Sequence, residues 1–305
     1  MSERNLRRIL GTLGILVAVW LISTLLSGRG GGAPGGGGVA SLLEDLDETT
    51  VRSVRIVGPT QTVSLERSDG AWTVNGYAAD STAVIRLWSA LEGAVVGGVV
   101  VNNPRNHARM GLSADSTWAV DFTLTDGGIT SLLVGKGGPI FPSGYMRLPD
   151  QDAVVVVSGD LRPALTRSLT DWRDKTILRV DTAAVVRVVL ETDAGTHIAE
   201  RSDSVWSVDG EPANETTMRS VLGELANLVA LGFVEDGEVF QQNRTRVIAI
   251  GAAGDTLGAV VLTGEVGNRH ARTPGSDVVF EVASFRADRV TPDIATLRAA
   301  DPGGV

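Results

Sequence analysis

Alternating apolar and polar positions run through most of the chain beyond residue 50. Trp118–Leu124 is a clear example, and a period of two is typical of a strand with one buried face. Two stretches, 84–91 and 218–225, instead carry apolar residues at i, i+3, i+4 and i+7, which predicts amphipathic helices. Asp80 and Asn214 stand where such helices need an N-terminal cap. The pattern therefore predicts antiparallel sheets with packed helices, an α+β fold.

One eleven-residue signature, Glu66–Gly76, occurs again as Glu200–Gly210, 134 positions later. Each copy contains a tryptophan, Trp72 or Trp206, and each copy leads into one of the two helical stretches. An aromatic residue in an alternating strand usually belongs to the core, so we expect both indoles to be packed inside. The repetition predicts two tandem homologous α+β units, which cover residues 42–178 and 179–305.

Residues 9–26 form an uncharged and almost continuously apolar run. Eighteen helical residues span roughly 27 Å, which is close to the hydrocarbon thickness of a bilayer. Three arginines precede the run and one follows it, which favours a cytoplasmic amino terminus. A cleaved signal peptide is the alternative, although its first small-residue site, 38–40, lies far downstream. Residues 1–27 are therefore predicted to be a cytoplasmic tip and a transmembrane anchor in the inner membrane, with the rest of this single-pass chain periplasmic.

Residues 28–41 are rich in glycine and are predicted to form a flexible linker. A phosphate-binding loop would need a preceding strand, a lysine and a following helix, and this stretch has none of them. We expect the linker to let the extracytoplasmic units change their orientation relative to the membrane.

Charge and cysteine content exclude several classes of function. The formal charge of the whole chain is −9, and the part that follows the linker carries about −12. Such a surface repels phosphate groups, so no nucleic-acid partner is expected. The chain contains no cysteine, which excludes disulfides, thiolate metal sites and a thiol nucleophile.

Residue types that carry catalysis are sparse and scattered. The three histidines, His107, His197 and His270, show no metal-ligand spacing with one another or with acidic residues. We expect His197 to lie exposed at the edge of a sheet. Ser143 lacks the Gly-x-Ser-x-Gly frame of a serine nucleophile. No catalytic residue, metal site or cofactor is predicted, and the protein is expected not to be an enzyme.

One pair of matching strands carries polar and basic residues in both units. Tyr145 and Arg147 in the first unit correspond to His270 and Arg272 in the second. These four residues are candidates for lining a groove that binds an anionic ligand or a partner. The alternative is a pair of solvent-facing strands whose basic residues are neutralised by carboxylates.

Charges of both signs lie close together near the predicted boundary between the units. Asp171, Arg173 and Asp174 fall within one turn, a pattern that usually marks a local salt-bridge face. Like Trp72 and Trp206, they are predicted to be structural, and this charged cluster is expected to fix the angle between the units.

The order of several weak motifs resembles a known family. Along the chain come the anchor, the Glu-Arg-Ser-Asp-x-x-Trp signature, an Asn-Pro passage before Gly111-Leu112, then Thr125-Asp126-Gly127, Leu133-Val134-Gly135, Tyr145-x-Arg147, and Leu169 with Asp171-x-Arg173-Asp174-Lys175. This order resembles the bacterial domain-of-unknown-function family forty-three-forty, whose members are anchored envelope proteins, over about residues 42–300. The second unit departs from the pattern because it lacks both the Gly-Leu pair and the Asp-x-Arg-Asp-Lys element. The resemblance implies an association with ABC-type export systems of the gliding-motility kind, and it implies no catalytic residue.

Two functions from different classes are compatible with these features. The first is a membrane-anchored binding or scaffold module that acts as an accessory to a transporter or envelope complex, with a protein partner and with the membrane contacted through residues 9–26. The second is an envelope hydrolase or transferase with its site in the groove between the repeats. A structural spacer that only sets distance is a third, weaker alternative.

Overall fold

The computed structural model of the chain describes residues 37–234, 244–263 and 269–299. The predicted anchor and most of the predicted linker therefore lie outside the described residues. Among the residues that are described, no helix is both long and apolar enough to cross a bilayer. The chain divides into two compact units, Met1–Arg173 and Asp174–Val305. The predicted boundary lay five residues later, after residue 178.

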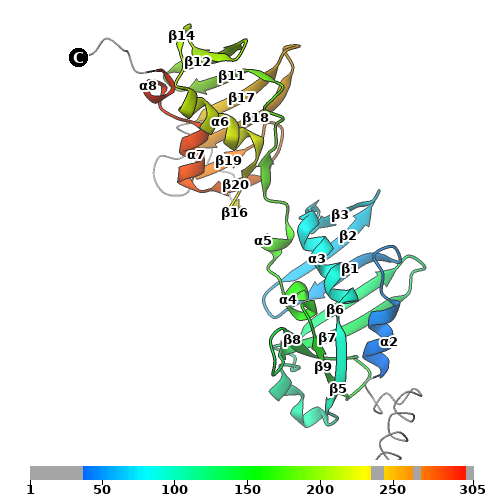
Figure 1. Cartoon of the computed structure of the whole chain (residues 1–305). Helices are drawn as coiled ribbons and strands as arrows, with labels where there is room; N and C mark the ends of the chain where they lie inside the picture. Colours follow the sequence, from blue (N-terminus) through cyan, green and yellow to red (C-terminus); the bar gives the residue numbers. More distant parts are fainter. Residues whose placement is uncertain (1–36, 235–243, 264–268, 300–305) are drawn as a thin grey trace, which may run out of the picture. The chain divides into compact units, whose positions relative to one another are not determined.

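Unit 1 is built on one antiparallel sheet of nine strands, in the order β4-β3-β2-β1-β6-β7-β8-β9-β5 (Figure 1). Its strands are β1 (Val51–Val57), β2 (Thr62–Ser68), β3 (Ala71–Val74), β4 (Tyr77–Ala78), β5 (Val95–Val101), β6 (Trp118–Leu124), β7 (Ile129–Gly137), β8 (Ser143–Arg147) and β9 (Val154–Ser158). Its helices are α2 (Gly37–Asp45), α3 (Ser81–Glu92), the 3₁₀ helix η1 (Pro104–Met110), α4 (Leu161–Leu165) and α5 (Leu169–Trp172).

Unit 2 contains a second nine-stranded antiparallel sheet, in the order β14-β13-β12-β11-β17-β18-β19-β20-β16. Its strands are β11 (Val185–Thr192), β12 (Gly195–Ser202), β13 (Val205–Val208), β14 (Glu211–Pro212), β16 (Gly232–Val234), β17 (Thr245–Gly251), β18 (Thr256–Thr263), β19 (Arg269–Arg272) and β20 (Val279–Val282), beside a small sheet of β10 (Thr176–Leu178) and β15 (Leu228–Val229). Its helices are α6 (Glu215–Ala226), α7 (Ser284–Val290) and α8 (Ile294–Leu297). Position by position, this strand order repeats that of unit 1.

The predicted α+β class is wrong, because the described residues form mostly antiparallel sheet. Strands make up 44% of them and helices 24%, and the strands belong chiefly to the two large sheets. The sequence pattern underestimated the sheets because β5 and β16 fold back along the last strand of each unit and extend it. Helical structure near the end of unit 1 is also brief, because α4 has five residues and α5 has four.

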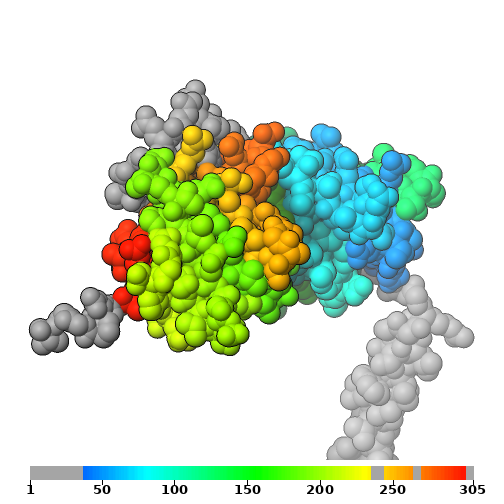
Figure 2. Space-filling view, turned by 90° about the horizontal axis from the view of Figure 1, so that it is seen from above, coloured from blue at the N-terminus to red at the C-terminus, as the bar shows by residue number. Residues whose placement is uncertain are grey.

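The core of each unit lies between one face of its sheet and the helices that cover that face (Figure 1). In unit 1, Val54 and Ile56 of β1 and Leu87 of α3 are fully buried in this layer. Side chains of the opposite parity, such as Arg55, face away from it. Each unit is closely packed in the space-filling view (Figure 2).

The repeated signature forms the same hairpin turns in both units. Asn75 and Asp209 both have positive φ angles, 47° and 52°, and a glycine with positive φ follows each of them. A two-residue turn with φ above zero at both positions matches the twist of the adjoining strands, which explains the Asn-Gly and Asp-Gly pairs. The predicted caps are confirmed, since Asp80 accepts the backbone N–H of Ala83 and Asn214 accepts two N–H groups of α6.

The predicted linker is shorter than the sequence indicated. Helix α2 begins at Gly37, although residues 37–41 were assigned to the linker. Val39, Leu42 and Leu43 are buried in the core of unit 1. The burial of these apolar side chains outweighs the low helix propensity of the two glycines at the start.

Candidate functional site

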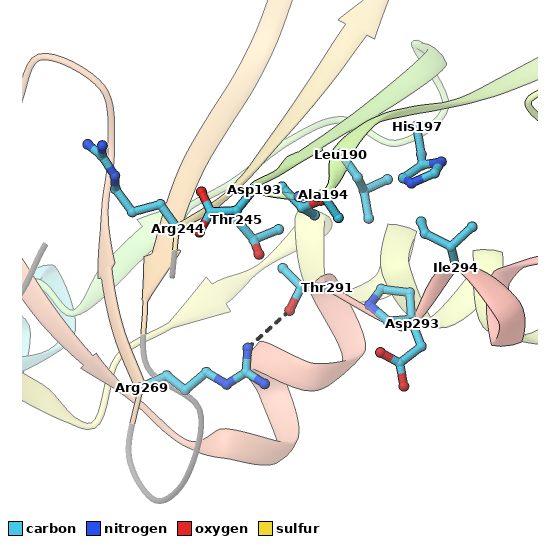
Figure 3. A pocket seen from close by; sticks show the side chains of 12 residues that line it. Leu190, Asp193, Ala194, His197, Arg244, Thr245, Arg269, Thr291, Asp293 and Ile294 are labelled. Atoms are coloured by element: carbon cyan, nitrogen blue, oxygen red, sulfur yellow. Dashed lines mark hydrogen bonds between the residues drawn. The ribbon is translucent and has the colours of Figure 1, made fainter. Parts of the chain in front are cut away.

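Unit 2 contains an open pocket of about 470 Å³ at one end of its sheet (Figure 3). The pocket lies between the β11–β12 hairpin, the first residues of β17 and β19, and the segment that joins α7 to α8. Its lining residues are Leu190, Thr192, Asp193, Ala194, His197, Arg244, Thr245, Arg269, Thr291, Pro292, Asp293 and Ile294. The volume falls in the range of small-molecule sites.

The lining combines a small apolar part with hydrogen-bonding groups of every kind. Leu190 is buried and contributes to the core, whereas the carboxylates of Asp193 and Asp293 belong to exposed residues. Arg269 is held in place by an ion pair with Asp288 of α7 and by a 3.4 Å hydrogen bond to Thr291 Oγ1 (Figure 3). The pocket can therefore offer donors and acceptors to a polar ligand.

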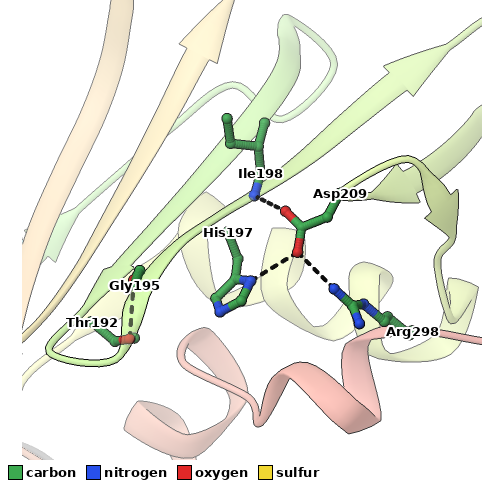
Figure 4. A network of polar contacts seen from close by, with 6 residues as sticks. All are labelled: Thr192, Gly195, His197, Ile198, Asp209 and Arg298. Atoms are coloured by element: carbon green, nitrogen blue, oxygen red, sulfur yellow. Dashed lines mark hydrogen bonds and ion pairs between the residues drawn. The ribbon is translucent and has the colours of Figure 1, made fainter.

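His197 on the pocket wall belongs to a charged network with Asp209 and Arg298 (Figure 4). His197 Nδ1 lies 2.8 Å from Asp209 Oδ2, and Arg298 Nη2 donates to the same oxygen at 2.8 Å. The other oxygen, Asp209 Oδ1, accepts the Ile198 N–H at 2.9 Å. These contacts, first the Ile198 N–H and then His197 and Arg298, lower the pKa of Asp209 to about 2.

The network fixes the imidazole in one orientation. When Nδ1–H donates to Asp209, the lone pair is on Nε2, which is the arrangement that general bases use. No hydroxyl group is hydrogen-bonded to this imidazole in the part of the chain that the structure describes. Nor do the described residues contain three His, Asp or Glu side chains grouped to hold a metal ion. The oriented imidazole and the polar lining could contact a polar ligand.

Strand register shows which residues of unit 1 correspond to the pocket. Leu190 pairs with His197 and Val247, as Ile56 pairs with Val63 and Val120 in unit 1. Thr192 lies two residues after Leu190, as Gly58 lies two residues after Ile56, so these two positions correspond. Thr245 lies two residues before Val247, as Trp118 lies two residues before Val120, so these two correspond as well. The pair Thr192 and Thr245 in unit 2 and the pair Gly58 and Trp118 in unit 1 therefore occupy equivalent positions.

In unit 1 the equivalent space is filled by Trp118. A Cβ added at Gly58 would lie 2.5 Å from the six-membered ring of this indole, and the ring packs against the core. Unit 2 has Thr192 and Thr245 at these two positions. The exchange of a tryptophan for a threonine removes most of the filling group, and Thr192 takes back only part of the volume.

A second closing contact of unit 1 is also missing from unit 2. Gln61 Nε2 donates to the Arg167 carbonyl oxygen at 2.7 Å, and its Oε1 accepts the Leu169 N–H at 3.0 Å. These bonds tie the β1–β2 hairpin to the segment before α5. The equivalent residue in unit 2, Gly195, has no side chain. The pocket is therefore open in unit 2 because two residues that fill the site in unit 1 are replaced by smaller ones.

The four residues predicted to line a groove lie in different units. Tyr145 and Arg147 alternate with buried Met146 on β8, so both point away from the core of unit 1. His270 and Arg272 do the same around buried Ala271 on β19 in unit 2. That the two pairs form a common groove stays a prediction.

Arg147 has a structural role that the sequence did not reveal. Its Nη1 lies 2.9 to 3.1 Å from the carbonyl oxygens of Leu148, Pro149 and Gln151, so the guanidinium group holds the loop after β8. His270 stands opposite Glu281 on the neighbouring strand β20.

The two signature tryptophans occupy equivalent places. Trp72 stands opposite Arg67, and Trp206 stands opposite Arg201. Trp72 is partly buried, packs against the Trp88 ring at 5.8 Å and donates its Nε1–H to Glu48 at 3.0 Å. Trp206 is buried, and the Arg201 guanidinium lies 5.8 Å from its ring centroid.

The charged residues near the boundary make local contacts. Asp171 accepts a hydrogen bond from Ser168 Oγ at 2.6 Å at the start of α5. The Arg173 guanidinium stacks over the Tyr77 ring at 3.7 Å, and Asp174 accepts the Thr176 N–H at 2.9 Å. Their predicted role in fixing the angle between the units stays a prediction.

The expectation for the place of His197 is wrong. His197 does not lie at a sheet edge, because β12 is paired on both sides and the side chain is only 26% exposed. His107 is buried, with Nε2 2.9 Å from the Asp152 carbonyl oxygen. The sequence pattern did not predict the network of His197 and Asp209. The available signal was Asp209 itself, an acidic residue where the first copy of the signature has Asn75.

Fold and pocket together define a class: a duplicated antiparallel-sheet protein in which one site is filled by an indole in unit 1 and is open and ligand-sized in unit 2. The chain belongs to the family described as Domain of unknown function (DUF4340), whose model matches residues 72–245, more than half of the sequence. This confirms the family that the motif order indicated. No curated protein matches the chain, and no solved structure does.

Proposed function

We propose that this protein is a non-enzymatic binding module of the cell envelope. In this proposal residues 9–26 attach it to the inner membrane, and its units outside the cytoplasm recruit a protein or an envelope polymer for a transporter complex. The observation that carries the proposal is the open pocket of unit 2 at a site that unit 1 fills with Trp118. Loss of a filling side chain in one copy, with the strand order kept, is what selection for a ligand would leave.

The association with an ABC-type export system comes from the family resemblance. It agrees with a chain whose charge after residue 36 is strongly negative, which suits a partner protein better than nucleic acid or anionic lipid. The proposal therefore places the bound partner or polymer at unit 2.

The test compares the wild-type chain with a variant whose pocket is filled. The double substitution Thr192→Gly and Thr245→Trp gives unit 2 the residue pair that closes the site in unit 1. The full chain is expressed at its native level and purified in mild detergent, and co-purifying membrane proteins and envelope polymers are identified. We expect the wild type to retain a membrane partner and the filled variant to lose it.

A matched control is Val205→Trp, which adds the same indole at an exposed site of unit 2 away from the pocket. This control should retain the partner. A wild-type chain that purifies without a partner, or a filled variant that keeps its partner in full, would contradict the proposal.

A second function is favoured by one observation, the imidazole of His197 oriented by Asp209. This pair could act as a general base in an envelope hydrolase. The site would then lie in unit 2 and not in the predicted groove between the repeats. Turnover of a model ester that disappears in His197→Ala, and persists in the control His270→Ala, would support it over the binding module.

A further inference from the structure

The loop between β7 and β8 of unit 1 presents two large apolar side chains to solvent. Ile140 is 77% exposed and Phe141 is 87% exposed. The loop is held in shape by the Gly138 N–H, which donates to the Ser143 carbonyl oxygen at 3.1 Å, and by a hydrogen bond from Ser143 Oγ to the Ile140 carbonyl oxygen. A preformed apolar projection loses little conformational entropy when it is buried, which is a property of interface anchors. We name residues 138–143 the apolar loop.

A pocket of about 510 Å³ lies beside the apolar loop, between α3 and α4. The Gly159 N–H on its rim donates to the Pro142 carbonyl oxygen of the loop at 3.0 Å, so the two features are adjacent. Small and apolar residues line most of this helix-side pocket: Ser89, Ala90, Gly93, Gly159, Pro163 and Ala164. The volume is large enough for a phenylalanine side chain.

At the equivalent place in unit 2, the described residues carry charged side chains where unit 1 has uncharged ones. The aligned caps Asp80 and Asn214 make Glu224 the counterpart of Ala90, and Glu224 is buried. It forms ion pairs of 3.4 Å with Arg286 and Arg289, which occupy the positions of Leu161 and Ala164. A charged cluster thus fills the space that is open in unit 1.

Unit 2 also lacks the sequence of the apolar loop. Between β18 and β19 the chain reads Gly-Glu-Val-Gly-Asn, with none of the Pro-Ile-Phe-Pro residues found between β7 and β8. The apolar loop sequence and the small residues around the pocket therefore occur together in unit 1, and both sequences differ in unit 2.

We infer that two copies of this chain associate through unit 1, each inserting Phe141 of its apolar loop into the helix-side pocket of the other copy. A two-fold contact needs a projection and a cavity on the same surface, and the Gly159–Pro142 hydrogen bond shows that they are neighbours. Charge favours this place as well. The body of the chain is acidic and repels a second copy, whereas residues 137–146 carry no charge.

The rim of the helix-side pocket agrees with an uncharged guest. Arg86 and Arg167 are accompanied by Asp160, so charges of both signs surround the opening. Val95, which is 66% exposed at the start of β5, pairs with Ser158, the residue before Gly159, and extends the apolar surface.

The first test is cross-linking, for which the absence of native cysteine is an advantage. Full-length chains with Ile140→Cys and full-length chains with Ser89→Cys are given different tags, mixed in mild detergent and oxidised. We expect a disulfide between differently tagged chains. The control replaces Ser89→Cys with Ile85→Cys, an exposed position on the same helix outside the pocket, and should give no such product.

The second test measures the dimer dissociation constant of the full chain by sedimentation velocity. Phe141→Ser should raise it about 30-fold, the effect expected of an interface anchor. Ser89→Trp, which fills the pocket, should have a comparable effect. The control Ile129→Ser removes an exposed apolar residue of unit 1 elsewhere, and should change the constant less than about twofold.

Three results would overturn the inference: a monomer at all accessible concentrations, a dimer insensitive to Phe141→Ser, or cross-links only between two Ile140→Cys chains. A chain that remains monomeric but inserts Phe141 into detergent or lipid would also overturn it. These results do not depend on the pocket of unit 2, so failure of this inference and failure of the proposed function can be told apart.

Discussion

Replacing Asp209 by asparagine separates the charge of the His197–Asp209–Arg298 network from its hydrogen-bonding role. Asn75 shows that an amide fits here, since its Oδ1 accepts the Ser64 N–H at 2.7 Å in unit 1. Asp209→Asn should therefore keep the bond to the Ile198 N–H and lose only the attraction to the two cationic partners.

The size of the effect follows from the exposure of the three side chains. Those of His197, Asp209 and Arg298 are 26%, 28% and 42% exposed, so solvent screens their ion pairs. The lowering of the pKa from 3.8 to about 2 sets an upper limit of roughly 2.4 kcal/mol. Part of that belongs to the Ile198 bond, which remains. We expect Asp209→Asn to lower the free energy of unfolding of unit 2 by about 1 kcal/mol.

The pH dependence has a definite sign. The pKa of Asp209 is lower in the folded chain than in the unfolded chain, so its contribution is complete above about pH 4 and disappears as the pH falls through 2. The difference between wild type and Asp209→Asn should therefore vanish near pH 2. Asp209→Ala should cost about 2 kcal/mol at pH 7, because it also removes the Ile198 bond at a residue with φ 52°.

Hydrogen exchange of the full chain, read by mass spectrometry on peptides of β12 and β13, measures this effect within unit 2. A loss of 1 kcal/mol corresponds to about fivefold faster exchange of the most protected amides. Asp203→Asn is the matched control, since Asp203 has nearly the same backbone conformation, with φ 56°, in the adjacent turn. The charge of Asp209 would be shown to contribute nothing if exchange in Asp209→Asn were unchanged at pH 7, or if the deficit at pH 2 were as large as at pH 7.

Three further predictions concern side-chain contacts within a single unit. Trp118→Ala should destabilise unit 1 by about 2–4 kcal/mol, measured by urea denaturation, because it opens the space that the indole fills; a loss below 1 kcal/mol would show that the indole fills nothing. Arg173→Ala should lower the free energy of unfolding of unit 1 by about 1 kcal/mol in the same assay, since it removes the stacking on Tyr77, and Tyr77→Ala should not add to that loss. Glu224→Gln should cost unit 2 about 1 kcal/mol at neutral pH through its ion pair with Arg286, and an unchanged denaturation midpoint would count against that pair.

The repeated signature made the hairpins predictable, because the turn residues Asn75 and Asp209 and the spacing of 134 positions carry local information. The extent of the sheets was not local. Strand β5 pairs with β9, more than fifty residues away, and no property of its own sequence names that partner. A prediction from the local pattern of each element therefore assigned too much of the fold to helices and too little to the sheets.

The residues of the candidate site meet through contacts between distant parts of the chain, which local sequence patterns do not indicate. Arg298 meets Asp209 across 89 positions, and it matches Arg173 at a spacing of 125 positions, nine fewer than that of the signature. This shift concealed the counterpart of Arg173. The rest of the Asp-x-Arg-Asp-Lys element is absent from the second unit, because residues 296–300 read Thr-Leu-Arg-Ala-Ala. The pocket was visible only as Trp118 replaced by Thr245, and the strand register of both sheets was needed to align those two residues.

The reactivity of a single thiol at position 245 shows whether unit 2 has a cavity at the site that unit 1 fills with Trp118. The chain has no native cysteine, so Thr245→Cys can be labelled with methanethiosulfonates of increasing size. The control Val247→Cys lies two residues further along the same strand face and is fully buried in the wild type. If the cavity is present, methyl and benzyl reagents modify Thr245→Cys at similar rates without lowering its melting temperature, while Val247→Cys stays protected. Exclusion of the benzyl reagent from Thr245→Cys, or unfolding of unit 2 when it reacts, would show that there is no such cavity.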